Sequence, residues 1–327
     1  MIALIIFNLI TLLIFYLLLN NAYQLANYLK LFDQPNKRKI HKKKIPLIGG
    51  VLIWLTFGLS LLIQYYSFNL NIEFLKFYIL SSLFFLIGFI DDKYSLKANL
   101  RLFLLFFLSV IIYKFLGINE VKFILVDKIG LIHIYYGSIF FSVFCLLLFQ
   151  NSMNMIDGLN GLSTSIFIGL LLFLLLKNLS LDQFIIIQLT LFLIIFLFFN
   201  LKNKIFMGDA GIYFLSCFIG LCVIHLSQNQ SNITVNSIFL IMILPGIDML
   251  RLFIQRIYNK TYPFNPDKNH IHHILIKKYS SNITLAIILC LSFFPIIAFE
   301  FLKINYFITL ILFFIIYFWL ISKKKSI

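Results

Sequence analysis

Residues 151–162 have the sequence Asn-Ser-Met-Asn-Met-Ile-Asp-Gly-Leu-Asn-Gly-Leu and lie between two long apolar runs, residues 136–150 and 162–176. Glycine permits tight turns, and Asn and Asp supply oxygen ligands, so this segment is poorly suited to a lipid-facing helix. An ionisable residue at a membrane marks a candidate functional site. The alternative is an ordinary turn between two spans, in which Asp157 makes an Asx-turn.

The composition predicts an all-α, polytopic membrane protein. The 327 residues are 61% hydrophobic and only 12% charged, whereas soluble domains carry about 25% charged residues. Apolar runs long enough to cross a bilayer recur along the chain, so we expect about eleven spans within one membrane domain, residues 1–327. No cleavable signal peptide is expected, because residues 2–19 have no basic segment before them and no small-residue cleavage site. The expected spans are roughly 2–19, 47–66, 74–90, 99–116, 136–152, 161–177, 183–200, 211–227, 235–252, 283–300 and 304–321.

The basic residues predict the orientation. With eleven spans, most of the 27 Lys and Arg residues fall in loops on one side of the membrane. This asymmetry places the N-terminus outside and the C-terminus in the cytoplasm. The net charge of +15 therefore reflects membrane topology rather than nucleic-acid binding. On the outer side, residues 121–126 and 129–135 flank Asp127-Lys128, which predicts a short hairpin.

Four polar segments share the predicted cytoplasmic side. A basic loop over residues 38–50, which contains His41, lies there as well. Adjacent carboxylates are costly unless they share a cation or a proton. The alternatives are that Asp92 caps the fourth span and that Asp209 caps the eighth. The four segments are Asp91-Asp92, residues 151–161, Met207-Gly-Asp209-Ala-Gly211, and residues 265–273 with His270, His272 and His273.

These segments favour a metal-assisted phosphate site. Carboxylates with Asn oxygens suit Mg²⁺, with Mn²⁺ as the alternative, better than Zn²⁺. Three spans begin directly after these segments, so their N-termini direct free N–H groups at one region, where Lys97 and Arg101 add positive charge. We therefore predict a magnesium-dependent site for a pyrophosphate-bearing substrate, with a lipid as the second substrate. Two alternatives without a catalytic or binding role remain: the histidines belong to a solvated loop, and Asp248 forms a purely structural pair with Arg251.

The motifs in this order resemble those of the polyprenyl-phosphate N-acetylhexosamine-1-phosphate transferases, the superfamily that includes phospho-MurNAc-pentapeptide translocase. The resemblance is closest to the bacterial branch that begins O-antigen, enterobacterial common antigen or teichoic-acid linkage synthesis. The matching residues are Arg38…His41…Pro46…Gly49-Gly50, Gly88-Phe-Ile-Asp91-Asp92, Asn151-Ser-Met-Asn154-Met-Ile-Asp157-Gly158, Phe206-Met-Gly-Asp209-Ala-Gly211, and Pro263-Phe-Asn-Pro266-Asp267…His270-Ile-His272-His273.

The resemblance implies a reaction on the cytoplasmic face of a bacterial plasma membrane. A UDP-N-acetylhexosamine gives its sugar-1-phosphate to undecaprenyl phosphate, and UMP is released. The resemblance further implies that Asp209 and Asn154 hold Mg²⁺, that Asp91 acts as base with support from Asp92, and that Asp157 lies on the nucleotide side. The remaining candidates, all for substrate binding, are Asn151, Gly158, Asn160, Arg101, Lys97, His41, His270, His272 and His273.

Two departures from the family pattern stand out. The usual Asp-Gly-x-Asp-Gly has Asn160, which keeps an acceptor oxygen but loses the charge, and Gly211 is followed by Ile212 instead of Ser. The alternatives are a phospho-MurNAc-pentapeptide transferase, an inactive scaffold, and a transporter or lipid flippase, whose ionisable residues would lie near the membrane midplane. The sequence leaves open the UDP-sugar, the glycan pathway, a covalent aspartyl-phosphate route and a homodimer.

Overall fold

The protein is built from apolar helices. The computed structural model describes residues 2–35, 43–68, 72–116, 118, 120–134, 136–177, 183–229, 233–263 and 267–322, and 78% of the structure is helical. Arg38 and His41 lie outside the described residues, and so do their predicted contacts. The helices are α1 (Ile2–Asn20), α2 (Ala22–Leu29), α3 (Gly49–Phe68), α4 (Ile72–Tyr94), α5 (Ala98–Phe115), α6 (Ser138–Ile156), α7 (Leu162–Lys177), α8 (Gln183–Leu201), α9 (Gly208–Asn229), α10 (Val235–Tyr258), α11 (Ile271–Ile276), α12 (Ser281–Glu300) and α13 (Tyr306–Ser322).

Most of these helices have the length and composition of membrane spans. Within the described part of the chain, nine helices meet both criteria: α1, α3, α4, α5, α6, α8, α9, α10 and α12. The apolar helices α7 and α13 are shorter, with 16 and 17 residues. The prediction of a polytopic helical membrane protein is confirmed. The total of eleven spans stays a prediction, although each predicted span coincides with an apolar helix.

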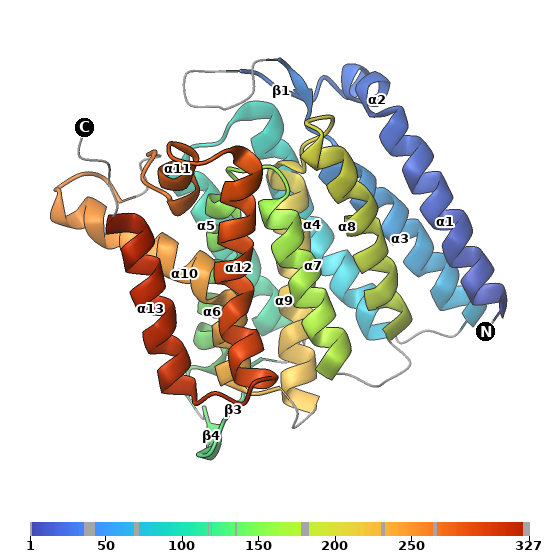
Figure 1. Ribbon diagram of the computed structural model, residues 1–327. Helices are drawn as coiled ribbons and strands as arrows, with labels where there is room; N and C mark the ends of the chain where they lie inside the picture. Colours follow the sequence, from blue (N-terminus) through green and yellow to red (C-terminus); the bar gives the residue numbers. More distant parts are fainter. Residues whose placement is uncertain are drawn as a thin grey trace.

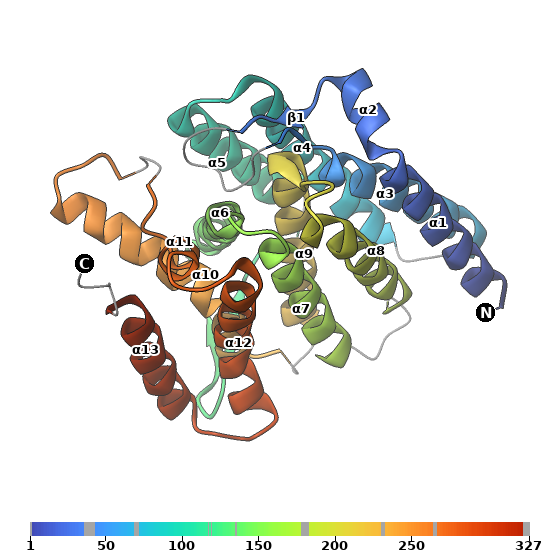
Figure 2. The ribbon, with the colours of Figure 1, turned by 45° about the horizontal axis from the view of Figure 1, so that its top comes forward.

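Helix α9 lies at the centre of the bundle, whereas α1 and α13 lie at opposite edges (Figure 2). It packs against α3, α4, α6 and α7. Glycines allow its first turn to approach its neighbours closely: a Cβ at Gly88 of α4 would lie 2.4 Å from the carbonyl oxygen of Asp209. A Cβ at Gly50 of α3 would lie 2.3 Å from Gly211. The beginning of α9 is therefore held directly against the segments that carry the candidate residues.

Two short antiparallel strand pairs lie at opposite ends of the bundle (Figure 1). At one end, β1 (Phe32–Asp33) pairs with β2 (Ile45–Pro46). At the other end, β3 (Phe123–Val126) and β4 (Gly130–His133) form the predicted hairpin. The β2 end is also attached to the segment before α9, because the Phe206 N–H donates to the Pro46 carbonyl at 2.9 Å.

Candidate functional site

The ends of α4, α5 and α6 meet beside the first turn of α9. Asp91 and Asp92 lie in the last turn of α4, Arg101 in the first turn of α5, Asn154 in the last turn of α6, and Asp209 at the start of α9. Helix ends leave backbone donors and acceptors without partners inside the helix, so polar side chains concentrate there. The tertiary fold thus brings together residues from three polar segments that are far apart in the sequence.

Arg101 contacts two carboxylates from different helices. Its Nη1 lies 2.8 Å from Asp91 Oδ2 and 3.6 Å from Asp209 Oδ2. Asp91 also accepts a hydrogen bond from the Leu96 N–H at 2.7 Å, and its side chain is buried. A buried carboxylate needs such partners to remain ionised. Arg101 therefore offsets the negative charge that the fold concentrates between α4 and α9.

Asp92 stabilises the beginning of α9. Its carboxylate accepts hydrogen bonds from the N–H groups of Asp209 at 2.8 Å and Ala210 at 3.0 Å. These N–H groups have no acceptor within the helix, and the carboxylate faces the positive end of the helix dipole. The alternative that Asp92 caps the fourth predicted span is wrong. That span corresponds to α5, whose N-cap is Lys97, whereas Asp92 accepts hydrogen bonds from the first turn of α9.

Asn154 and Asp209, the predicted metal ligands, are in direct contact. The Asn154 Nδ2 donates to Asp209 Oδ1 at 2.9 Å and to the Tyr213 hydroxyl at 3.0 Å. Sequence reasoning missed Tyr213. Its position four residues after Asp209, one turn along the same helix face, was the available signal. Among the described residues, no group of three or more His, Cys, Asp and Glu side chains is arranged to hold a metal ion.

Asp157 follows the last turn of α6 and accepts a hydrogen bond from the Ser163 hydroxyl. Asp157 lines a cavity and is accessible from it. Burial raises the pKa of Asp157 to about 6, and the Ser163 hydrogen bond opposes part of that rise. The ionised form of Asp157 is therefore less stable, relative to its protonated form, than the ionised form of an ordinary surface aspartate.

An open cavity of about 1410 Å³ is lined by the four aspartates and by Arg101. It is bordered by basic side chains from the first loop, from the segment after α8 and from the segment after α10. Carboxylates beside several cations suit a phosphorylated anion that arrives with a divalent metal. The predicted residues that line the cavity are Asp91, Asp92, Arg101, Asp157, Gly158, Asn160, Asp209 and His273. The lysines that line it are Lys43, Lys44, Lys202, Lys204 and Lys268.

Asn160 and Gly161 are attached to the end of α8. The Asn160 Nδ2 donates to Asn203 Oδ1 at 2.5 Å, and the Gly161 N–H donates to Asn200 Oδ1 at 2.6 Å. Both partners were missed from the sequence, where they only mark the end of an apolar run. The amide that replaces the family's carboxylate at position 160 thus has a protein partner at the cavity wall.

The histidines of the fourth polar segment differ in their surroundings. His273 lines the cavity, whereas His270 and His272 are buried. The His272 ring packs against Gly158, where a Cβ would come within 2.1 Å of His272 Nε2. Burial lowers the pKa of His272 to about 3, and burial together with neighbouring cations lowers the pKa of His273. The alternative of a solvated histidine loop does not hold for His270 and His272.

Three further candidates are not among the residues that line the cavity: Asn154, which reaches it only through its contact with Asp209, Asn151 and Lys97. Asn151 donates to the Leu147 carbonyl within α6 at 2.8 Å. The exposed Lys97 precedes α5, and its carbonyl accepts the Arg101 N–H at 3.1 Å. Lys97 therefore contributes to the site through its backbone carbonyl, which helps to position Arg101.

Comparison with known proteins agrees with the motifs. Residues 74–227 match the model of glycosyl transferase family 4, a range that contains Asp91, Asp92, Asn154, Asp157 and Asp209. The chain is 29% identical over 255 residues to the "Probable undecaprenyl-phosphate N-acetylglucosaminyl 1-phosphate transferase" of Bacillus subtilis (strain 168), which covers 75% of this chain and 69% of the relative. It is 27% identical over 281 residues to the "Undecaprenyl-phosphate alpha-N-acetylglucosaminyl 1-phosphate transferase" of Salmonella typhi and of Escherichia coli (strain K12), with 78% of this chain and 72% of each relative covered. The order of the motifs and the carboxylates gathered at one cavity agree with this similarity, which covers residues 74–227 for glycosyl transferase family 4 and about three quarters of the chain for the undecaprenyl-phosphate N-acetylglucosaminyl 1-phosphate transferases.

Proposed function

We propose that the protein transfers N-acetylhexosamine-1-phosphate from a UDP-sugar to undecaprenyl phosphate and releases UMP. The observation that carries the proposal is the contact of Arg101 with both Asp91 and Asp209 at the wall of a lysine-bordered cavity in a polytopic membrane chain. The relatives are undecaprenyl-phosphate N-acetylglucosaminyl 1-phosphate transferases, so UDP-N-acetylglucosamine is the first donor to test.

The proposed topology has eleven spans and places the cavity at the cytoplasmic face, with the N-terminus outside. Lysines 43, 44, 202, 204 and 268 all border the cavity, and basic loops mark the cytoplasmic side. In this topology the two short apolar helices also cross the membrane; α7 and α13, with 16 and 17 residues, lie at the lower limit of the about 17–25 residues of a membrane span. One continuous apolar cluster from α1 to α13 supports a single domain over residues 1–327.

Magnesium is the proposed cofactor, and Asn154 and Asp209 are the residues that would hold it. The Asn154 side-chain amide is in contact with the Asp209 carboxylate, so both side chains would be close enough to hold the same ion. Oxygen ligands of this kind are those that Mg²⁺ prefers. The assignment of the amide oxygen and nitrogen is interchangeable by a flip, so the oxygen is available to a cation. When bound, the ion supplies charge neutralisation to the diphosphate oxygens.

The chain's own groups act mainly by positioning, as phosphoryl transfer requires. Asp92 holds the first turn of α9 and therefore presents Asp209 to the cavity. Asp91 holds the Arg101 guanidinium, which is then available to the phosphate oxygens. The second pKa of a phosphate monoester is about 6, so the acceptor lipid is mostly ionised at pH 7. Since both Asp91 oxygens already accept hydrogen bonds, we assign Asp91 an orienting role rather than that of a base.

Turnover by the full chain in lipid nanodiscs tests the proposal. The reaction contains undecaprenyl phosphate, Mg²⁺ and one UDP-sugar at a time, including UDP-MurNAc-pentapeptide, and mass spectrometry follows UMP and the diphospholipid. We expect both products with a UDP-N-acetylhexosamine, and a loss of at least about 100-fold in Asp209→Ala. The matched control is Asp127→Ala in the β3–β4 turn, which should keep wild-type turnover. Transport of a lipid or solute without UMP release would overturn the proposal in favour of a transporter.

A further inference from the structure

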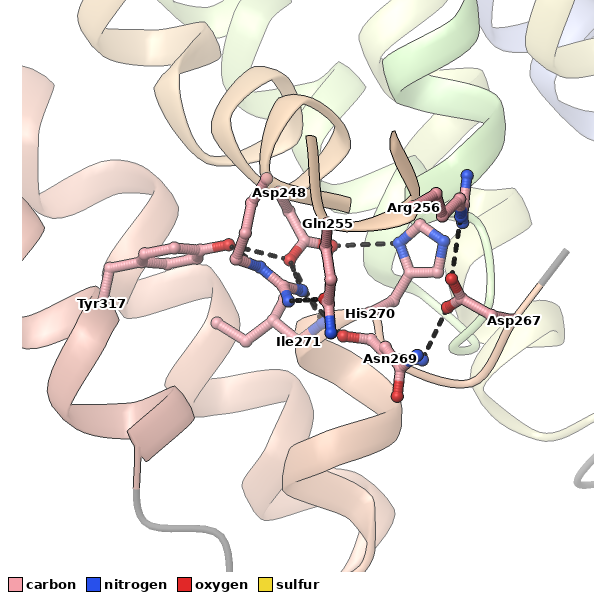
Figure 3. A network of polar contacts seen from close by, with 9 residues as sticks. Asp248, Gln255, Arg256, Asp267, Asn269, His270, Ile271 and Tyr317 are labelled. Atoms are coloured by element: carbon pink, nitrogen blue, oxygen red, sulfur yellow. Dashed lines mark hydrogen bonds and ion pairs between the residues drawn. The ribbon is translucent and has the colours of Figure 1, made fainter. Parts of the chain in front are cut away.

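A second polar network surrounds Asp248 (Figure 3). Asp248 lies on α10, and its side chain is only 3% exposed. Its Oδ1 accepts hydrogen bonds from Arg251 Nη2 at 2.8 Å and from the Tyr317 hydroxyl at 2.9 Å. Its Oδ2 lies 3.0 Å from His270 Nδ1. Asp248 therefore contacts α13 on one side and the histidine segment on the other.

Tyr317 connects the last helix to this network. Its hydroxyl donates to Asp248 and accepts a hydrogen bond from Arg251 Nε at 2.9 Å. The ring is fully buried, so the hydroxyl depends on these two partners. An ordinary pairing of residues three positions apart would need only Arg251 and Asp248. The participation of Tyr317 and His270 shows that the network joins three separate elements.

The histidine loop, residues 267–273, is attached to α10 at both ends. Near its start, Asp267 Oδ2 accepts a hydrogen bond from Arg256 Nε at 2.8 Å. Further along, the Asn269 carbonyl accepts from Arg251 Nη2 at 2.7 Å, and the Ile271 N–H points at Asp248 Oδ1 at 3.3 Å. The backbone on both sides of His270 is thus held by Asp248 and Arg251.

The rings of the three histidines continue this arrangement to the cavity. The His270 and His272 rings are stacked, with centroids 5.5 Å apart and an interplanar angle of 15°. The His272 and His273 rings are 4.2 Å apart. His272 packs on Gly158, beside Asp157, and His273 lines the cavity. A displacement of His270 would therefore reach the cavity wall through two ring contacts.

We infer that Asp248 is a positioning residue for the histidine loop, and that Tyr317 and Arg251 hold its carboxylate in place. The carboxylate orients the His270 ring and selects the tautomer with Nδ1 protonated, as a partner on one ring nitrogen does elsewhere. The oriented loop keeps His272 against Gly158 and presents His273 to the cavity. These positioning residues lie outside residues 74–227, the range that the family model matches. The kinetic consequence rests on the proposed function, whereas the structural consequence does not.

Chemical labelling tests the structural consequence without turnover. The full chain in nanodiscs is treated with diethyl pyrocarbonate, and fragment-ion mass spectrometry gives a rate for each of the three histidines. In the wild type we expect His273 to react and His270 to be protected. Tyr317→Phe removes one hydroxyl and should raise the His270 rate about threefold, and Asp248→Asn should raise it about tenfold. The matched control is Tyr306→Phe on the same helix, whose ring packs on Phe299, and it should leave the rates unchanged.

Steady-state kinetics test the functional consequence. His273 and Lys268 border the cavity with Gly158, next to the nucleotide-side Asp157. We therefore expect Asp248→Asn to raise the KM for the UDP-sugar about tenfold, while the KM for undecaprenyl phosphate stays within about twofold of the wild-type value. A purely stabilising role would reduce the amount of active protein, and hence the apparent kcat, without changing one KM selectively.

The two readouts separate the inference from the proposed function. A wild-type protein that releases no UMP from any UDP-sugar refutes the function, and the labelling rates still decide the role of Asp248. Unchanged His270 labelling in folded Asp248→Asn and Tyr317→Phe proteins overturns the inference. If Asp248→Asn does not give a monodisperse protein, the milder Tyr317→Phe decides alone.

Discussion

Replacing Gly208 by alanine should disturb the Asp92 carboxylate and, through it, the beginning of α9. Gly208 has a φ of +77°, in the left-handed region that favours glycine. A Cβ at this position would lie 2.6 Å from Asp92 Oδ2, closer than real Cβ atoms approach. The Asp92 carboxylate must therefore move away from the N–H groups of Asp209 and Ala210, whose hydrogen bonds it accepts in the wild-type protein.

The cost has two parts that can be worked out separately. The left-handed backbone costs a residue with a Cβ about 1–2 kcal/mol. Each lost hydrogen bond from an N–H group to the charged Asp92 carboxylate costs about 1.5–3 kcal/mol. The strain lowers the stability of the folded state, whereas the lost hydrogen bond frees Asp209 from its position. At about 1.36 kcal/mol per tenfold in rate, one lost bond predicts a fall in kcat of about 10- to 150-fold.

Two other glycines supply matched controls for the two parts. Gly130→Ala introduces the backbone strain without any steric contact, because φ is +96° and a Cβ would meet nothing within 4 Å. Gly246→Ala carries neither part, because a Cβ there also meets nothing, and as a helix residue it should gain about 0.5–1 kcal/mol. UMP release at saturating substrate and thermal unfolding in nanodiscs are measured for all three. Gly208→Ala protein that folds and keeps more than about one third of the wild-type kcat would refute the reasoning.

Three further outcomes are expected from the same assays. Because the pKa of Asp157 is raised to about 6, its ionised form is lost as the pH falls through that value. At saturating undecaprenyl phosphate, kcat/KM for the UDP-sugar should therefore rise with pH up to about 6 and then level, and this limb should be shallower in Asp157→Asn, where only the phosphate of the acceptor still titrates near pH 6. Asn160→Asp should keep turnover within about threefold, since the Asn203 amide can flip and donate to the new carboxylate; a tenfold loss would contradict this assignment. Lys177 Nζ lies 2.8 Å from Glu300 Oε2 at a partly buried site. Lys177→Met should therefore lower the free energy of unfolding, by less than the about 3–5 kcal/mol that breaking a fully buried pair costs, and should leave kcat unchanged. An unaltered unfolding midpoint would show that the pair contributes nothing to stability.

The helices and the location of the polar segments follow from local properties of the chain. A run of apolar residues must satisfy its backbone internally in a bilayer, so each run of sufficient length forms a helix wherever it lies. The hairpin at residues 121–135 follows from two β-prone runs around Asp127-Lys128, again without reference to distant residues. The candidate residues Asp91, Asp157 and Asp209 follow from their exclusion from lipid-facing positions.

Only the tertiary structure decides how those segments face one another. Asp92 caps α9 rather than the helix that follows it in the sequence, Asn160 pairs with Asn203, and Tyr317 of the last helix holds Asp248. Each of these contacts depends on the rotation of one helix about its axis relative to a neighbour that is far away in the sequence. A pattern of residue types defines which face of a helix is polar, but the choice of partner is made by close packing, such as Gly88 against Asp209 and Gly50 against Gly211. That packing, and not the motifs themselves, turns separate polar segments into one cavity.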